Sequence, residues 1–236
     1  MRVAGQLAGR TLQAVAKAVE PGITTKELDR VAEEFIRKNG GKPTFIGYRG
    51  YPASLCVSIN DEVVHGIPGP RKLKAGDVVS VDVAATIGGF VGDTATTVIV
   101  PPAAAAAQKL VRVTEQSLLA AIDCMKPGNR LGDIGSAVQN AAESNGFGVV
   151  RDFVGHGIGR RMHEEPAVAN YGTPGTGLRL EPGLVLAIEP MVTLGDWHVR
   201  VLQDGWTVVT EDGSLAAHFE HTIAITENGP EVLTQV

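Results

Sequence analysis

Two ten-residue segments of this sequence resemble each other and indicate how the chain folds. Residues 73–82 are Leu-Lys-Ala-Gly-Asp-Val-Val-Ser-Val-Asp, and residues 180–189 are Leu-Glu-Pro-Gly-Leu-Val-Leu-Ala-Ile-Glu. Each has glycine at its fourth position, continues with an apolar run typical of a buried strand, and ends in a carboxylate. The second copy follows the first at an offset of 107 residues, from Leu73 to Leu180. A repeat of this kind predicts two similar structural units in one chain.

The residues that precede each copy extend the repeat to a helix in each unit. A Pro-Gly pair at 21–22 recurs at 127–128, and an Asn-Gly pair at 39–40 recurs at 145–146, both at an offset of 106 residues. Apolar residues recur at helical spacing inside each interval, which predicts amphipathic helices that begin near Thr25 and near Leu131. The two halves, about 1–102 and 103–236, would then meet about a pseudo-twofold axis. In that arrangement the carboxylates that end the two quoted segments would face each other.

The remaining patterns predict the other elements of an α+β fold with two helix-plus-sheet halves in one catalytic domain, 1–236. The stretch from Val3 to about Val19 has the spacing of an amphipathic helix. Proline is tolerated in a first helical turn and alanine favours helix, so we expect a helix to begin at Pro101-Pro102 and continue to Met125. Segments rich in valine, isoleucine and threonine predict strands over Leu55–Ile59, Val78–Ala85 and Phe90–Val100.

Composition favours a soluble protein of a reducing compartment. The 236 residues are 44% hydrophobic with a net charge of -5, which gives no support to binding of nucleic acid or an anionic membrane. The N-terminus lacks the apolar stretch of a signal peptide, and no apolar run approaches the roughly 20 residues that span a bilayer. The two cysteines have no paired spacing of a disulfide or zinc site. We therefore expect a cytoplasmic location and no contact with membranes.

Four carboxylates lie in strand-like, apolar sequence, where acidic residues are uncommon. They are Asp82, Asp93, Glu189 and Glu220. Alone, Asp82 or Asp93 is as well explained by a turn or a solvent-facing position as by function. Four carboxylates in one core would cost several kcal/mol each if left unpaired, so bound cations would have to compensate them.

A histidine could add a nitrogen ligand to these carboxylates, although a lone histidine beside glycines is more often a turn or core residue than a ligand. His156 lies in Gly-His-Gly-Ile-Gly, where the glycines leave room around the imidazole. Oxygen ligands with one imidazole suit manganese, iron or cobalt, and also zinc in two-metal hydrolases. His163 follows before Glu-Glu-Pro, and His65 precedes a turn that it could merely cap. We assign no role to His198, His218 or His221, and we expect Glu164 and Glu165 to be structural or solvated.

Other catalytic classes lack their motifs. No phosphate-binding loop of Walker spacing and no Gly-x-Ser-x-Gly nucleophile elbow occur in the sequence. Cys56 lies in an apolar strand, which favours a buried, inert thiol in a pocket wall over a nucleophile.

Seven segments, in this order, resemble type I methionine aminopeptidases over essentially the whole chain. They are Val-Val-His65-Gly-Ile-Pro, Val-Asp82-Val, Gly-Asp93-Thr, Gly-His156-Gly-Ile-Gly, His163-Glu-Glu-Pro, Ile-Glu189-Pro-Met and Phe-Glu220-His-Thr. The resemblance implies the pita-bread (creatinase/aminopeptidase) fold around a dinuclear metal site. It implies that Asp82, Asp93, His156, Glu189 and Glu220 bind two divalent ions of Co, Mn, Fe or Zn. His65 and His163 resemble the two catalytic histidines that are not ligands, and Glu189 would also move protons.

The resemblance extends to the substrate pocket and to the subfamily. It places methionine-pocket positions at Tyr51, Cys56, Met162 and Trp206, although Met162 stands where we would expect an aromatic residue. Only 31 positions separate Glu189 from Glu220, without the helical insertion of type II enzymes, and no zinc-binding extension is recognised. The chain therefore resembles the minimal bacterial form. A monovalent cation near Asn60 is a further implication.

The activity so implied is removal of the N-terminal methionine from nascent polypeptides that have a small second residue. The substrates would be methionine-initiated chains, the ribosome is a further candidate partner, and a monomer is expected. Two alternatives stay open at this point. One is a proline-specific aminopeptidase or dipeptidase of the same fold, which His65-Gly-Ile-Pro and the absence of a long N-terminal domain disfavour. The other is a metal-free relative that binds peptides without turnover, which the five retained ligands disfavour.

Overall fold

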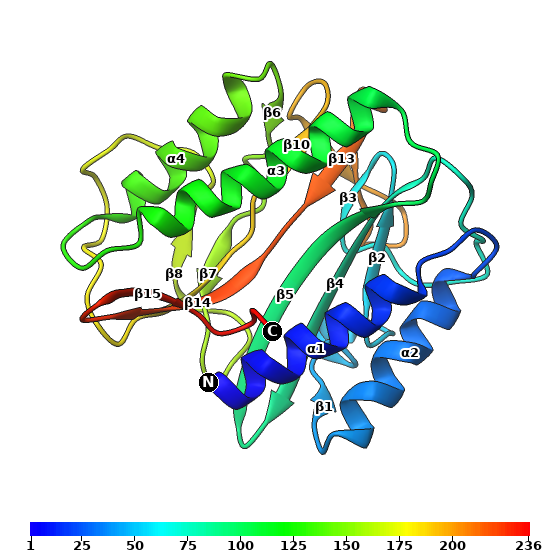
Figure 1. Ribbon diagram of the computed structural model, residues 1–236, viewed down its shortest axis with the longest axis horizontal. Coiled ribbons are helices and arrows are strands. Elements are labelled where there is room, and N and C mark those ends of the chain that lie inside the picture. Colours follow the sequence, from blue (N-terminus) through cyan, green and yellow to red (C-terminus); the bar gives the residue numbers. More distant parts are fainter.

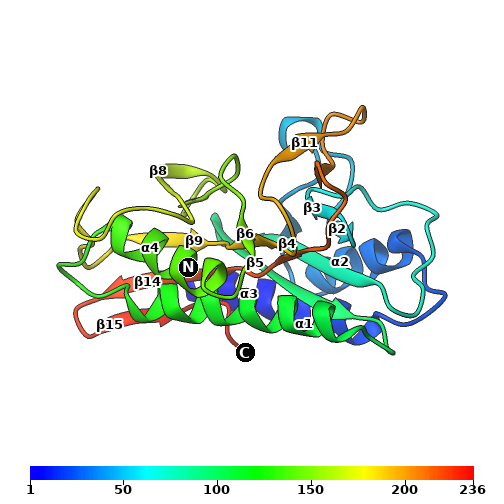
Figure 2. The same cartoon turned by 90° about the horizontal axis from the view of Figure 1, so that it is seen from above.

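Four helices form one face of the molecule, and the strands form the layer above them (Figures 1 and 2). The computed structural model describes residues 1–236. The helices are α1 (Arg2–Ala18), α2 (Thr25–Lys38), α3 (Ala105–Asp123) and α4 (Leu131–Glu143). They agree with the predicted helices except at the start of α3, which follows the two prolines instead of including them. The reason is that Pro102 disfavours helical backbone at Pro101, and neither residue has an N–H to donate. None of the helices is both long and apolar enough to cross a bilayer.

The starts of α2 and α4 show the repeat at atomic detail. Glu27 accepts a hydrogen bond from the backbone N–H of Thr24 (2.8 Å), and Asp133 accepts one from the backbone N–H of Arg130 (2.7 Å). In both helices a carboxylate in the first turn satisfies a backbone donor that has no partner within the helix. The same local device therefore begins the equivalent helix of each half.

A central strand with a neighbour on each side is the equivalent unit of the two sheets. In the first half, β4 (Val78–Ile87) pairs antiparallel with β2 (Cys56–Ile59) and β5 (Phe90–Ile99), and also with the short β1 (Lys42–Pro43). In the second half, β9 (Val185–Ile188) pairs antiparallel with β7 (Gly155–Gly157) and β14 (His221–Thr226). β8 (Glu164–Val168) and β15 (Gly229–Val232) form the edges of this second sheet.

Two smaller sheets and one short turn complete the fold around the central strands. One sheet contains β13 (Ala216–His218), β10 (Met191–Thr193) and β6 (Gly148–Val149) in that order. The other contains β11 (Val199–Val201), β12 (Val208–Thr210) and β3 (Glu62–Val64). The 3-10 turn η1 (Tyr48–Gly50) follows β1. Figure 2 shows that β11 and β8 lie on the side opposite α1 and α3.

The two halves are joined by backbone hydrogen bonds between Ala95 of β5 and Glu220. The Ala95 N–H donates to the Glu220 carbonyl (3.2 Å), and the Glu220 N–H donates to the Ala95 carbonyl (3.0 Å). The Thr222 hydroxyl adds a bond to the Asp93 carbonyl (2.7 Å). Asp93 and Glu220, which are separated by more than 120 positions in the sequence, are thereby fixed next to each other at the junction.

Each half has its own apolar core beneath its sheet. Leu7, Leu28 and Val81 belong to the first cluster, and Leu110 and Leu186 belong to the second. α1 packs closely on β5 at Gly92, where a Cβ atom would lie 2.6 Å from the backbone of Ala4. Glycine at this position therefore allows a helix to support the strand segment that carries Asp93.

Candidate metal centre and substrate cavity

The four strand-associated carboxylates line one cavity of about 250 Å³ between the two halves. Asp82 lies on β4 and Asp93 on β5, whereas Glu189 directly follows β9 and Glu220 lies between β13 and β14. Asp82 and Glu189, which end the repeated segments, line the same space, as the pseudo-twofold arrangement predicts. Asp93 and Glu220 are only 4% and 2% exposed.

The acidic side chains are left with too few hydrogen-bond partners. One buried carboxylate oxygen of Asp82, of Asp93 and of Glu220 has none. Burial first, and then the charges of Asp93 and Glu189, raises the pKa of Asp82 well above its usual range. Burial likewise raises the pKa of Asp93 to about 7. For both Glu189 and Glu220, burial and then the charge of Asp93 raise the pKa well above the usual range. Without a cation, this arrangement is electrostatically unfavourable.

His156 directs a nitrogen lone pair toward these carboxylates. Its Nδ1 lies 2.9 Å from the carbonyl oxygen of Gly157, and since a carbonyl only accepts, Nδ1 carries the proton. Nε2 is then an acceptor, and it lies 3.5 Å from Oε1 of Glu189. Asp93, His156 and Glu220 each offer one potential ligand atom, and these three atoms lie within 4.8 Å of one another. The backbone thus fixes the tautomer that can bind a metal ion.

The chemistry of these groups fits divalent cations. Oxygen atoms of several carboxylates and one neutral imidazole nitrogen are ligands that manganese, iron, cobalt and zinc accept. The buried oxygen atoms without partners are the positions that a cation would satisfy. All five predicted ligands line the cavity, so the structure brings together what the sequence distributes over residues 82–220.

The two further histidines border the same cavity. His65 directly follows β3 with a left-handed backbone (φ 61°), and burial lowers its pKa to about 4. His163 lies between β7 and β8, with its ring 4.1 Å from that of His156. Its Nδ1 lies 2.8 Å from the hydroxyl of Tyr48. Part of His163 faces solvent, but the ring is partly desolvated against the cavity; this desolvation, and then the charges of neighbouring groups that include Arg49, lowers its pKa to about 4. Both rings are therefore neutral near pH 7.

One end of the cavity has an apolar wall. Tyr51, Cys56 and Met162 are 3%, 4% and 5% exposed and belong to one apolar cluster, against which the half-buried Trp206 packs. The Tyr51 ring meets that of Trp206 edge-on at 5.0 Å. Burial raises the pKa of the Cys56 thiol, which keeps it protonated. All four predicted pocket residues thus lie on this wall.

Five side chains around the site were not singled out by the sequence. Phe45, Tyr48, Arg49 and Phe153 line the cavity, and their segments contain no motif that separates them from ordinary loop residues. His218, which we had assigned no role, is 2% exposed and its Nε2 lies 3.8 Å from Oε2 of Glu189 without a hydrogen-bond partner. Its position two residues before Glu220 was the available signal. His198 and His221 do not line the cavity.

Comparison with known proteins identifies the family. The sequence matches metallopeptidase family M24 over residues 1–227. The chain belongs to this family. This M24 chain is 54% identical over 236 residues to a methionine aminopeptidase of Clostridium perfringens, covering 100% of this chain and 95% of that protein. It is 51% identical, over 100% of its own length and 95% of the relative, to methionine aminopeptidase 1 of Bacillus subtilis.

Solved structures of the M24 family confirm the predicted pita-bread fold. The crystal structure of methionine aminopeptidase from Thermotoga maritima has a TM-score of 0.98 at 52% identity, covering 100% of this chain and 95% of that one. A prolidase from Pyrococcus horikoshii has a TM-score of 0.80 at 22% identity, over 60% of that chain. At this lower identity the likeness concerns the fold alone. The resemblance drawn from the seven motifs is therefore confirmed, and the chain is a metallopeptidase.

Proposed function

We propose that this chain removes the N-terminal methionine from polypeptides by hydrolysing their first peptide bond. The observation that carries the proposal is a group of five potential ligands directly beside an apolar wall of Tyr51, Cys56, Met162 and Trp206. A methionine side chain is unbranched and apolar and fits an irregular pocket of this kind. Two relatives that are 54% and 51% identical to this chain over 95% of their own length are named methionine aminopeptidases, which supports the same conclusion.

In this proposal Asp82, Asp93, His156, Glu189 and Glu220 would hold two divalent ions. When bound, such ions polarise a carbonyl and lower the pKa of water. Asp93 and Glu220, which the junction of the two halves fixes next to each other, would both contribute carboxylate ligands. The surrounding carboxylates also attract the positively charged amino terminus of a substrate, which favours cleavage at the first residue.

Proton transfer is assigned to Glu189. Its side chain is 15% exposed and lines the cavity, so it reaches both ligands and substrate. We assign to it acceptance of a proton from the attacking water and delivery of that proton to the leaving amine. His218 Nε2, on the far side of the carboxylate from His156, would hold Glu189 in position.

His65 and His163 would act as neutral hydrogen-bond donors. If the Tyr48 hydroxyl donates to Nδ1 of His163, the proton of that ring is on Nε2. The Nε2–H group can then stabilise the oxyanion that develops from the scissile carbonyl. His65, whose ring packs edge-on against Phe153 at 5.6 Å, would contact the scissile amide nitrogen.

Several finer assignments belong to the same proposal. A small second residue is preferred, the protein acts as a cytoplasmic monomer, and the ribosome is a partner through the nascent chain. A monovalent cation binds near Asn60, whose backbone is left-handed (φ 63°) and whose carbonyl accepts from the N–H of Ala216. A proline-specific peptidase and a non-catalytic binding protein are the alternatives that the test must separate.

The test is cleavage of a Met-Ala-Ser peptide by protein as purified, after chelation, and after Mn²⁺, Co²⁺, Fe²⁺ or Zn²⁺ is restored. We expect chelation to abolish release of methionine and at least one metal to restore it. The reason is that the five side chains would hold the metal ions on which hydrolysis depends. An Ala-Pro peptide serves as the control for the proline-specific alternative. Full turnover in excess chelator, with metal shown to be absent, or no turnover with any metal, would refute the proposal.

A further inference from the structure

Arg49 has an unusual backbone for an arginine. It lies in η1 with φ 49° and ψ 26°, in the left-handed region, between Gly47 (φ 80°) and Gly50 (φ 89°). Glycine adopts this conformation freely, whereas other residues are strained in it. Strained residues cluster at functional sites, which directs attention to the side chain that is kept at this position.

Arg49 is the only lysine or arginine that lines the cavity, which is also lined by four carboxylates. It forms no salt bridge and no hydrogen bond with another residue, and its Cζ lies over the ring of Tyr48, 5.5 Å from the ring centroid. Because the side chain is exposed, its charge and its five N–H donors are open to a ligand. An arginine without an ionic partner beside a substrate cavity has the chemistry to bind a carboxylate in two-point contact.

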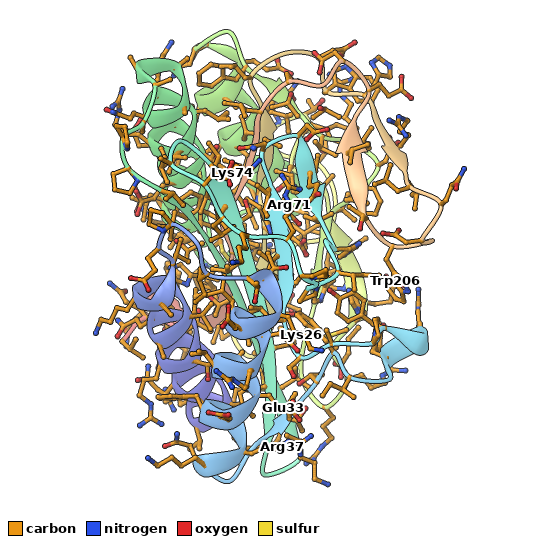
Figure 3. The ribbon with its side chains drawn as sticks, turned by 90° about the vertical axis from the view of Figure 1, so that its right-hand side faces the viewer. Lys26, Glu33, Arg37, Arg71, Lys74 and Trp206 are labelled. Atoms are coloured by element: carbon orange, nitrogen blue, oxygen red, sulfur yellow. The ribbon has the colours of Figure 1, made fainter.

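Arg49 lies at the open end of the cavity. Tyr51, Cys56 and Met162 form the buried end, whereas His163 and Arg49 are exposed. Tyr48 connects these two exposed residues, since its hydroxyl bonds to His163 and its ring contacts Arg49. Figure 3 shows Trp206 projecting on the same side of the molecule as the light-blue turn η1. Under the proposed function, methionine occupies the buried end, so the residues after the scissile bond leave past η1.

We propose that Arg49 is a specificity-determining residue that binds a substrate carboxylate located after the scissile bond. This inference rests on the proposed function and adds to it a preference among methionine peptides. The carboxylate is either the C-terminal group of a tripeptide or an acidic side chain at the third residue. A basic third residue is disfavoured by the same charge.

Two peptide pairs distinguish the sources of the carboxylate. The first pair is Met-Ala-Ser with a free or an amidated C-terminus, and the second is Met-Ala-Glu-amide with Met-Ala-Gln-amide. We expect the parent to cleave the acidic member of at least one pair with a kcat/KM about two- to five-fold higher, the size typical of an exposed ion pair. The pair that shows the preference identifies the source. The preference should decrease as salt is raised, because exposed charges are screened.

Three variants test whether Arg49 causes the preference. Arg49→Asn removes the charge with a residue that tolerates left-handed backbone, and the ratio within the pair should fall to near one. Arg49→Lys keeps the charge and should keep part of the ratio. Arg112→Gln removes an exposed charge from α3, outside the cavity, and should leave the ratio as in the parent. Comparing a ratio within one protein cancels losses of folded or metal-loaded enzyme.

The outcomes distinguish a failure of this inference from a failure of the proposed function. Equal cleavage within both pairs by the parent, or a parental ratio that persists in Arg49→Asn, would overturn the role of Arg49 while methionine release continues. Failure of the metal-loaded parent to cleave any of the four peptides would overturn the proposed function and, with it, this inference.

Discussion

Glu220→Gln should stabilise the metal-free protein and weaken metal binding at once. The substitution keeps the shape of a side chain that is 2% exposed but removes its negative charge. A donor oxygen of Glu220 lies within 4.8 Å of one of Asp93. Two like charges at that separation repel by about 3.5 kcal/mol at an effective dielectric constant of roughly 20. When a metal ion is bound, the effect of the Glu220 charge on stability is reversed, because the carboxylate then attracts the cation as a ligand.

The size of the effect follows from this repulsion. The parent relieves part of it by protonation, since the pKa of Asp93 is raised to about 7 and that of Glu220 well above its usual range. The gain should therefore be largest above pH 7, up to about 3 kcal/mol. For a chain of this length that corresponds to roughly 6–12 °C in Tm. Mn²⁺ affinity should fall at least about 10–100-fold, the loss seen when even an outer partner of a ligand is removed.

The assay is thermal unfolding at pH 8 with chelator and with a series of Mn²⁺ concentrations. Glu181→Gln is the matched control, because that exposed carboxylate lies outside the cavity, and it should leave both measurements unchanged. A structural carboxylate would behave in the opposite way. If Glu220→Gln lowers the Tm of the metal-free protein and leaves the Mn²⁺ affinity as in the parent, our account of the site is wrong.

Three further results are expected. Glu189→Gln should lower kcat at saturating metal by roughly 10²–10⁴-fold, which is the loss typical of removing a general acid–base. The control Glu164→Gln should keep a kcat near that of the parent. A kcat of Glu189→Gln within threefold of the parent would contradict the proton-transfer role. Because burial raises the pKa of Asp93 to about 7, the folded metal-free protein holds a proton that the unfolded chain releases near pH 4. That stabilisation decreases from about pH 4 upward and is lost once the pH has risen through about 7, so Tm in chelator should fall between about pH 4 and 7 and level off above it, and a fall of the same size in Asp93→Asn would exclude this cause. His218→Leu should lower both kcat and Mn²⁺ affinity, and His218→Gln should recover much of both by restoring an N–H donor. Equal kcat and equal Mn²⁺ affinity in the two variants would show that His218 only fills space.

Local sequence predicted the four helices and the strands over 55–59, 78–85 and 90–100, because these elements are specified by neighbours in the chain. The helix that begins after Thr24 has its first-turn Glu27 three residues away, and the apolar run that ends at Asp82 needs no distant partner to favour a strand. The repeat added long-range information, since similar segments fold similarly. It placed Asp82 and Glu189 on one cavity, which the structure bears out. The start of α3 was missed because the restriction that Pro102 places on its predecessor outweighs the tolerance for proline in a first turn.

The sequence by itself determined the two equivalent halves, and through its motifs the family and the candidate ligands. Only the tertiary structure decided which side chains meet in the cavity. Asp93 and Glu220 come together through backbone hydrogen bonds that join β5 of the first half to Glu220, between β13 and β14 of the second half. Arg49 and His218 acquire their positions from loop and strand geometry that no periodicity in the sequence records. The physical reason is that local propensity acts over a few residues, whereas a cavity between two halves is made by contacts between residues far apart in the chain.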